Sequence, residues 1–258
     1  WVQRAVGYSL VGVPEEQVFL TCWGSGANGK STFVATLQRI LGDYAQQIPT
    51  DLLVGRRDGA IPNDVARLMG ARFAVASEGE QGKRLAEATV KQLTGGDVVT
   101  ARFMRSEFFE FTPQATLWFV SNHRPEIRDT SHAMWRRVRL VPFTETIPTD
   151  ERDPRLAEKL LAEAPGILSW AVRGCLAWQK VGLGTAGAVD TATKSYHREQ
   201  DPIGHFLAEC TTSDDHASTP AAALYDAYTA WSDQQGLTTE NTTAFGRRLA
   251  DEGHTKAK

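Results

Sequence analysis

Eight consecutive residues, Gly24 to Ser31, have the types and the order of a phosphate-binding loop. They read Gly-Ser-Gly-Ala-Asn-Gly-Lys-Ser and satisfy the pattern GxxxxGK[ST]. In such a loop the glycines let backbone N–H groups turn towards phosphate oxygens, the lysine reaches the terminal phosphates and the serine hydroxyl binds Mg²⁺. The pattern therefore predicts binding of ATP with Mg²⁺. The expected nucleotide-binding residues are Gly24, Gly26, Asn28, Gly29, Lys30, Ser31 and Thr32.

The same glycines also fit GxGxxG, the pattern of a dinucleotide-binding fold. That fold needs an acidic residue at the end of a second strand about 20 residues further on. The nearest acid, Asp43, follows a helical pattern and Gly42 instead of an apolar strand. The phosphate-loop interpretation is the stronger one, and a plain glycine turn between core elements would need neither Lys30 nor Ser31.

Two further polar residues stand where apolar segments end. Glu78 follows the segment 71–77, and a carboxylate there could hold Mg²⁺ through water and polarise the attacking water, with Glu80 as the reserve candidate. Asn122 follows the apolar segment 116–121, where its amide could orient that water beside the γ-phosphate. A solvated loop acid and a turn-forming asparagine are the plainer alternatives.

An arginine pair, Arg136 and Arg137, precedes the apolar segment 138–141. Arginine supplied across a subunit boundary stabilises the charge of phosphoryl transfer and makes hydrolysis depend on assembly. A surface salt bridge is an equally good interpretation of any single arginine.

These residues need a scaffold of alternating strands and helices. The apolar run 18–23 ends at the glycine loop, and Phe33, Leu37, Ile40 and Leu41 follow it with helical spacing. Apolar segments separated by helices are typical of a parallel sheet that is covered on both faces and binds its ligand at the strand ends. The predicted fold class is therefore α/β.

A helix and a hairpin are expected between the second and third apolar segments. The residues 83–93 have a helical pattern that stops at Gly95-Gly96. Two β-rich pieces, 98–103 and 108–112, follow it and are expected to pair as a hairpin.

Only helices are expected beyond residue 143. We predict an ATPase core over 1–145, a helical lid over 146–188 and a C-terminal helical module over 189–258, with a polar, alanine-rich linker near 184–193. The last module is compatible with a truncated winged helix or with any small helical bundle.

The composition indicates an ordinary globular protein. The 258 residues are 41% hydrophobic and 23% charged with a net charge of -3, which excludes a disordered chain and leaves room only for a local basic patch. Three dispersed cysteines suggest neither a disulfide framework nor a zinc site. Without a signal-peptide pattern or an apolar run of about 18 residues, we expect a cytoplasmic protein with no membrane partner. Because the chain begins with Trp1, we also expect a fragment of a longer protein.

Several motifs in this order resemble superfamily 3 helicases, of the phage and plasmid primase-helicase type that is similar to the poxvirus primase-helicase. The resemblance extends from about Tyr8 to Phe143 and more loosely through Asp201-Pro202-Ile203 and 224–246. The motifs are the glycine loop, Ser77-Glu78, Lys91 to Asp97, Ser121 to Pro125 and Trp135-Arg136-Arg137.

The resemblance implies roles for individual residues. It makes Lys30 and Ser31 the first nucleotide motif, Glu78 the second, Asn122 the sensor and Arg137 the arginine finger, although the choice between the paired arginines stays open. Ser31 and Glu78 are the implied metal ligands. The expected catalytic residues are Lys30, Glu78, Asn122 and Arg137.

The resemblance also implies an assembly and a substrate. It implies an AAA+-type core, a homo-oligomeric, hexameric ring, ATP-driven movement on single-stranded DNA and a primase domain upstream. The hairpin would point into the ring channel, which makes Arg102 and Arg105 the candidates for binding DNA phosphates. An ordinary solvated hairpin tip is the alternative for these two arginines.

The expected function is that of an ATP-dependent replicative DNA helicase motor of a phage, plasmid or other mobile element. A P-loop phosphotransferase that acts on a small molecule would share the loop but would ignore DNA. A DNA-binding assembly scaffold that does not hydrolyse ATP is a third class, and intact Lys30, Ser31 and Glu78 argue against it.

Overall fold

The structure is a computed structural model, and it describes residues 1–55, 62–77, 82–212, 217–251, 253 and 254. The chain divides into two compact units, residues 1–194 and residues 195–258. No helix in the described ranges is both long enough and apolar enough to cross a membrane.

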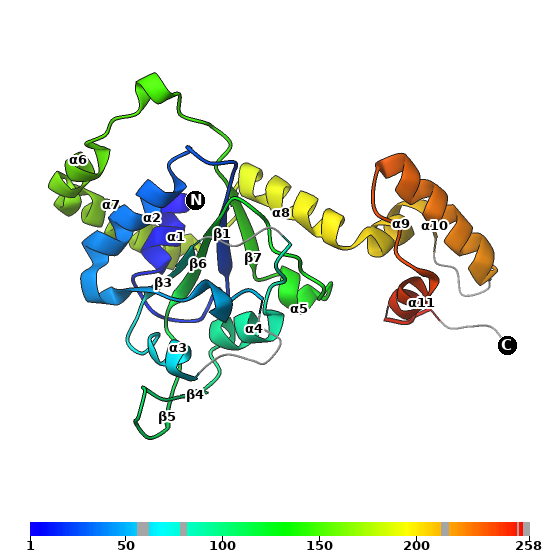
Figure 1. Cartoon of the computed structure of the whole chain (residues 1–258), viewed down its shortest axis with the longest axis horizontal. Coiled ribbons are helices and arrows are strands. Elements are labelled where there is room, and N and C mark those ends of the chain that lie inside the picture. Colours follow the sequence, from blue (N-terminus) through cyan, green and yellow to red (C-terminus); the bar gives the residue numbers. More distant parts are fainter. Residues whose placement is uncertain (56–61, 78–81, 213–216, 252, 255–258) are drawn as a thin grey trace. The chain divides into compact units, whose positions relative to one another are not determined.

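The first unit is built around a five-stranded parallel sheet with the spatial order β2-β3-β6-β1-β7 (Figure 1). The strands are β1 (Phe19–Trp23), β2 (Ala45–Gln47), β3 (Phe73–Ser77), β6 (Thr116–Ser121) and β7 (Val138–Pro142). The predicted α/β class with a parallel sheet is therefore confirmed. In the register, Trp23 pairs with Ser121 and Ser77 with Val120, so β1, β6 and β3 end at the same edge.

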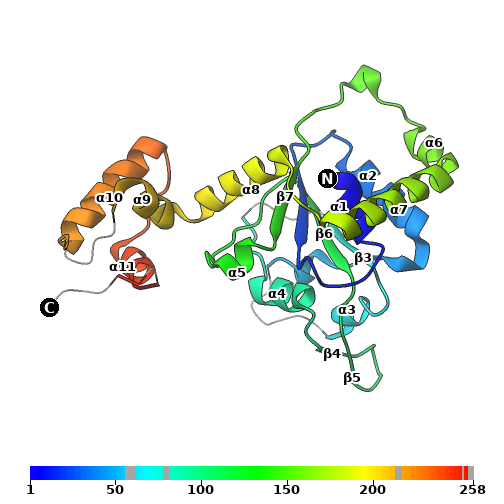
Figure 2. The same ribbon diagram turned by 180° about the vertical axis from the view of Figure 1, so that it is seen from behind.

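Helices cover both faces of this sheet, as Figures 1 and 2 show from opposite sides. One face packs Leu20 and Cys22 of β1 against α1 (Val2–Tyr8), α2 (Lys30–Leu41) and α7 (Ala164–Val181). On the other side lie α4 (Glu87–Gly95) and α5 (His132–Trp135). Because both faces are covered, the central strands are apolar along their whole length, which made them recognisable in the sequence.

Helices α1 and α7 cross at two glycines. A Cβ atom on Gly7 would lie 2.0 Å from the backbone N of Cys175, and one on Gly174 would lie 1.9 Å from the carbonyl O of Gln3. The two backbones can approach this closely only because neither residue has a side chain. The side chain of Gln3 adds a hydrogen bond from its Nε2 to the carbonyl O of Trp170, at 2.9 Å.

The predicted hairpin is confirmed, with shorter strands than expected. Strands β4 (Val99–Ala101) and β5 (Phe109–Phe111) pair antiparallel, and the hairpin projects away from the sheet in both views. The helix predicted to start at Lys83 is wrong at its beginning, since α4 starts only at Glu87. Leu85 lies before the helix, and its N–H donates to the carbonyl O of Glu126 at 2.8 Å instead of to a helical carbonyl.

The prediction of a linker near 184–193 is also wrong. Residues of that segment belong to α8 (Gly187–Gln200), and the side chain of Val189 is buried. Alanine and long polar residues are good helix formers, so the polar composition did not indicate missing structure.

The second unit has a small core of its own. Helices α9 (Pro202–Cys210), α10 (Ala221–Gln235) and α11 (Thr242–Asp251) pack Phe206, Tyr228 and Phe245 together. The helical spacing predicted for this module is therefore confirmed. The remaining helices of the chain are α3 (Pro62–Ala66) and α6 (Leu156–Ala162), with 3-10 turns at Gly42–Tyr44, Thr50–Leu52 and Thr149–Glu151.

Candidate functional site

The glycine-rich loop joins β1 to α2 and is open on its inner side. Gly26, Ala27 and Gly29 have positive φ angles of 110°, 49° and 83°. A Cβ atom on Gly26 or Gly29 would meet no described atom within 4 Å. In the described part of the chain no side chain caps α2, whose N-cap is Gly29, so the amides of its first turn are available to an anion.

The loop is fixed at its two ends by the segment that follows β7. A Cβ atom on Gly24 would lie 2.1 Å from the carbonyl O of Phe143, so only glycine fits there. Asn28 donates from Nδ2 to the same carbonyl O at 2.8 Å, and the N–H of Ile147 donates to the carbonyl O of Ala27 at 2.8 Å. These contacts fix the shape of the loop.

Lys30 is buried in this loop, with only 4% of its surface exposed. Its Nζ donates to the carbonyl O of Gly24 at 2.8 Å and to Oδ1 of Asn28 at 2.9 Å. Burial lowers the pKa of Lys30 and raises the pKa of the neighbouring Cys22 to about 12. Both acceptors of Lys30 are neutral, so a phosphate would bring the counter-charge that the buried ammonium favours.

The sensor candidate lies next to the loop. Asn122 is exposed and directly follows Ser121, which pairs with Trp23 at the end of β1. The Ser121 hydroxyl accepts a hydrogen bond from the N–H of His123 at 3.0 Å, which fixes the turn after β6. Glu78 and Glu80 lie outside the described residues, so their assignment as second nucleotide motif and metal ligand stays a prediction.

Arg124 is a site residue that the sequence interpretation missed. Its guanidinium carbon lies 4.8 Å from the ring centroid of Trp23, the residue that immediately precedes the loop. This cation–π contact joins the turn after β6 to the end of β1. Arg124 stands inside the motif Ser121 to Pro125, but its contact with Trp23 depends on a parallel pairing that a single sequence does not reveal.

Helix α4 contacts residues 128 and 129, which follow the turn after β6. The buried Glu87 accepts from the backbone N–H groups of Arg128 at 2.8 Å and Asp129 at 3.3 Å. Lys91 forms an ion pair with Asp129, with 2.7 Å between Nζ and Oδ2. Burial would raise the pKa of Asp129, but hydrogen bonds from Lys91 and Ser131 outweigh it and hold the pKa below its ordinary value.

The two paired arginines have different surroundings. Arg137 is buried, its Nε donates to the Thr94 hydroxyl of α4 at 3.2 Å, and its Nη1 donates to the carbonyl O of Ala133. Burial lowers the pKa of Arg137, and the positive charge of Arg136 adds to this effect. Arg136 is exposed and donates to the side-chain oxygen of Gln17, a residue held at the unusual φ of 49°.

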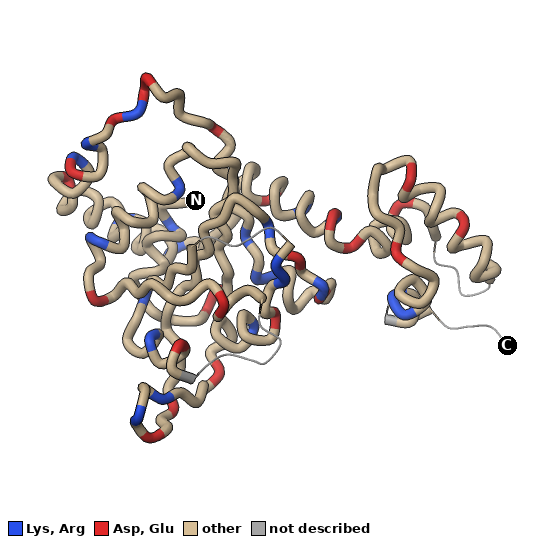
Figure 3. Tube along the Cα trace, viewed as in Figure 1, with Lys and Arg blue, Asp and Glu red and all other residues tan. Residues whose placement is uncertain are grey.

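The hairpin tip combines cations with exposed apolar side chains. Arg102 and Arg105 are both exposed, and Figure 3 shows basic and acidic residues together at this tip. Phe103 and Phe108 are 46% and 58% exposed, and the guanidinium of Arg102 lies 4.9 Å from the Phe108 ring centroid. The structure thus brings the two predicted arginines together with two aromatic rings that the sequence interpretation had not singled out.

The chain is similar to proteins of large DNA viruses. "Putative helicase 022R" of Frog virus 3 (isolate Goorha) is 29% identical over 251 residues, which are 88% of this chain and 26% of that protein. "Putative helicase L207/L206" of Acanthamoeba polyphaga mimivirus is 27% identical over 78% of this chain and 23% of its own length. "Putative primase C962R" of African swine fever virus (isolate Pig/Kenya/KEN-50/1950) is 23% identical over 90% of this chain and 26% of its own length.

Family models match two separate stretches. Residues 22–137 match a family of unknown function (DUF5906), and residues 198–254 match the Poxvirus D5 protein-like family. The chain is related to the viral primase-helicases. This confirms the relationship that the motifs suggested.

The fold of this chain is also found in a solved structure. The apo form of the C-terminal region of NrS-1 superposes with a TM-score of 0.52 at 12% identity, covering 82% of this chain and 55% of that one. At 12% sequence identity, the similarity between the two structures shows a shared fold alone. The chain spans about a quarter of the length of the curated relatives described above.

The different surroundings of the paired arginines lead to a prediction about stability. Replacing Arg137 with alanine should lower the free energy of unfolding of this chain by about 2–4 kcal/mol. A buried, hydrogen-bonded cation is lost, and Thr94 loses a hydrogen-bond partner. Urea denaturation followed by circular dichroism measures the change.

Arg136 provides the matched control, since it stands next to Arg137 but is exposed. Arg136→Ala should change the free energy of unfolding by less than about 0.5 kcal/mol. Equal losses in the two variants would contradict the different roles that we derive for their side chains.

Proposed function

We propose that this chain is the ATP-dependent motor of a replicative DNA helicase of a phage, plasmid or other mobile element. In this proposal ATP is hydrolysed at the subunit interfaces of a ring that moves on single-stranded DNA. The observation that carries the proposal is the open glycine-rich loop, with the buried Lys30 at its end and Asn122 beside it. The helicase and primase names of the relatives support a role in DNA replication.

ATP with Mg²⁺ fits the residues of the loop. The loop amides and Lys30 would hold the phosphates, the exposed Ser31 hydroxyl in the first turn of α2 would bind Mg²⁺, and Thr32 would contact the phosphates from the same turn. When bound, ATP supplies the free energy for movement through cleavage of its terminal phosphate. Gly26 and Gly29 leave the space that the nucleotide needs.

The order of the strands supports an AAA+-type core. Strand β6 lies between β1 and β3, so Asn122, which follows β6, stands between the loop that follows β1 and the end of β3 at Ser77. An amide in this place can orient a water molecule between the terminal phosphate and an activating carboxylate. For the second unit, three short helices with their own core support a winged-helix-like module.

The arginine pair supports a shared site between subunits. Arg136 is the exposed member, so its guanidinium is the one that can reach a neighbouring subunit without leaving a buried site. Arg137, the member that the resemblance favours, would anchor the pair to α4 through Thr94. Helix α4 ends at Gly95, and the chain enters the first hairpin strand at Val99, which links the arginines to the proposed DNA-binding element.

One experiment tests this function against its two rivals. Phosphate release would be measured with and without single-stranded DNA, and the same protein would be imaged with a nucleotide analogue. We expect rings and a turnover that DNA stimulates. A monomer whose turnover ignores DNA would favour a small-molecule phosphotransferase, and rings without turnover would favour an assembly scaffold.

The hairpin leads to a prediction about DNA affinity. Replacing Arg102 and Arg105 together with glutamine should lower the slope of log affinity against log salt by about 1.4, since each phosphate contact with a single strand contributes about 0.7. Replacing Phe108 with alanine should weaken binding by about 1–3 kcal/mol, with little change in that slope, if its exposed ring stacks on a base. Fluorescence anisotropy of a labelled oligonucleotide between about 50 and 200 mM salt measures both effects.

A matched control for the hairpin is Arg173, an exposed arginine on α7. Arg173→Gln should leave both the affinity and its salt dependence unchanged. If the double hairpin variant behaved like Arg173→Gln, the hairpin would not be the DNA contact.

A further inference from the structure

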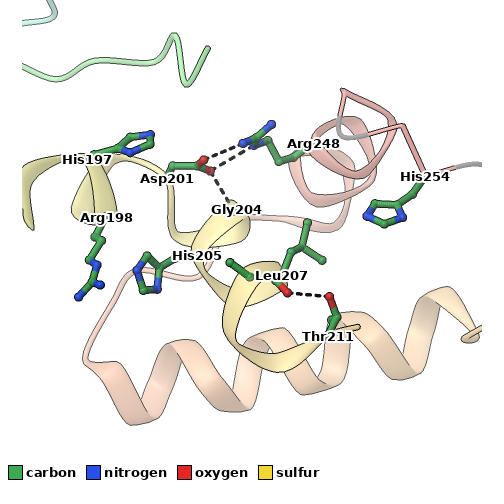
Figure 4. Close-up of a pocket in the computed structure, with 10 residues that line it drawn as sticks. His197, Arg198, Asp201, Gly204, His205, Leu207, Thr211, Arg248 and His254 are labelled. Carbon is green, nitrogen blue, oxygen red and sulfur yellow. Dashed lines mark hydrogen bonds and ion pairs between the residues drawn. The ribbon is translucent and has the colours of Figure 1, made fainter. Parts of the chain in front are cut away.

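The C-terminal unit contains a cavity that lies outside the nucleotide site (Figure 4). Its volume is about 510 Å³, which is within the usual range for small-molecule sites. Half of the described residues that line it are basic. They are His197, Arg198, His205, Arg248 and His254.

Asp201 is the carboxylate among these lining residues, and its oxygen atoms are already used. Its Oδ1 accepts from the N–H of Gly204 at 3.0 Å, and its two oxygens accept from Nε and Nη2 of Arg248 at 3.2 and 2.7 Å. Figure 4 shows Asp201 between these two partners. The ion pair fastens α11 to the start of α9 and compensates Arg248, so Asp201 contributes little free negative charge to the cavity.

Arg198 and His205 line the side of the cavity formed by α8 and α9. Arg198 is exposed, and His205 lies on the same side in Figure 4. His205 stacks on Trp231 with 6.0 Å between ring centroids, and its Nδ1 lies 3.5 Å from Oε1 of Glu209. These contacts hold the imidazole in place beside the cavity.

His197 lies close to the other charged groups of the cavity. Burial lowers the pKa of His197; Asp201 acts in the opposite direction, and Arg248 and His205 lower the pKa further. Arg248 and His205 are therefore both within electrostatic reach of His197.

The charge of the whole unit restricts which anion can bind. Residues 195–258 contain ten aspartate or glutamate residues and five lysine or arginine residues. A long polyanion would therefore be repelled by most of the surface, whereas a compact dianion would feel mainly the local cations. We infer that the cavity is a binding site for a single phosphate group, held between Arg198 and His205. The group can be free phosphate, a nucleoside phosphate or the phosphorylated end of a nucleic acid.

Histidine-resolved NMR titrations of the full chain test this site. Added inorganic phosphate should shift the imidazole signals of His205 and His197. His123, beside the glycine-rich loop, reports phosphate at the nucleotide site separately. A shift of His123 alone, or no shift of His205 at any phosphate concentration, would overturn the inference and leave the proposed motor function untouched.

Two variants decide whether the cavity is responsible. Arg198→Gln should weaken phosphate binding at His205 about tenfold, because one charge-assisted contact is lost. Arg247→Gln is the matched control, since Arg247 is exposed on α11 but does not line the cavity, and it should bind phosphate as the wild type does. Equal affinity in the wild type and in Arg198→Gln would refute the site.

Different probes identify the source of the phosphate. Oligonucleotides with and without a 5′-phosphate, adenosine monophosphate and inorganic phosphate would be compared by the same shift of His205. Binding of inorganic phosphate, adenosine monophosphate or the 5′-phosphorylated oligonucleotide supports the site. A response to the unphosphorylated oligonucleotide that equals the response to the phosphorylated one would overturn the restriction to a single phosphate.

Discussion

Replacing Lys30 with alanine should abolish the proposed ATP hydrolysis, with a loss in kcat of about 10²–10³-fold or more. The buried ammonium has two neutral oxygen partners in the loop, the carbonyl O of Gly24 and Oδ1 of Asn28. It is therefore already positioned for a phosphate and needs no reorganisation when charge develops in the transition state. Phosphate release at saturating ATP measures the loss.

Two companion variants separate catalysis from folding. Burial lowers the pKa of Lys30, which means that its charged form is less favourable in the folded chain than in water. Lys30→Met should therefore retain or raise the melting temperature of the nucleotide-free protein while losing turnover. Lys180→Ala, at an exposed lysine of α7, should change neither property. If Lys30→Met remained folded and kept full turnover, the loop would not be the site of hydrolysis.

The sequence predicted those parts of the site that depend on local patterns. The apolar run of β1, the glycines after it and the helical spacing from Phe33 onwards are contiguous, so they place Lys30 at the start of a helix without knowledge of the rest of the fold. Asn122 could be placed for a similar reason, because the end of an apolar strand is visible in a single segment. Both placements agree with the structure.

Contacts between distant segments could not be predicted in this way. The burial of Arg137 depends on Thr94, which is 43 residues away in the sequence, and the contact of Arg136 with Gln17 joins residues 119 positions apart. An arginine before a strand has the same appearance in the sequence whether it faces a neighbouring subunit or its own helix. The distinction comes from the contact of Arg137 with Thr94 of α4, which has no local signal.

Two differences from the predicted secondary structure have other physical causes. Strand β2 was not among the predicted strands, because it is short, polar and at the edge of the sheet, and its pairing with β3 leaves no apolar alternation in Ala45–Gln47. The segment near Gly187 was predicted as a linker because it is polar, yet a helix with one buried anchor such as Val189 needs few apolar residues.

Replacing Gly174 with alanine should lower the free energy of unfolding by about 3 kcal/mol or more. The added Cβ would lie 1.9 Å from the carbonyl O and 2.6 Å from the carbonyl C of Gln3, and backbone atoms cannot move aside as the end of a side chain can. Helices α1 and α7 would have to separate, which would expose apolar surface of the cluster that they share with β1. Urea denaturation of the full chain, followed by tryptophan fluorescence, measures this effect.

Gly166 is the matched control for this crossing, because it lies in the same helix and a Cβ atom there would meet no described atom within 4 Å. Gly166→Ala should stabilise the protein by about 0.4–1 kcal/mol, since alanine loses less backbone entropy than glycine when a helix forms. The two substitutions add the same methyl group to one helix, so an opposite sign can only come from the contact with α1. A stabilising effect of Gly174→Ala would show that the two helices do not approach each other as closely as the backbone positions of Gln3 and Gly174 require.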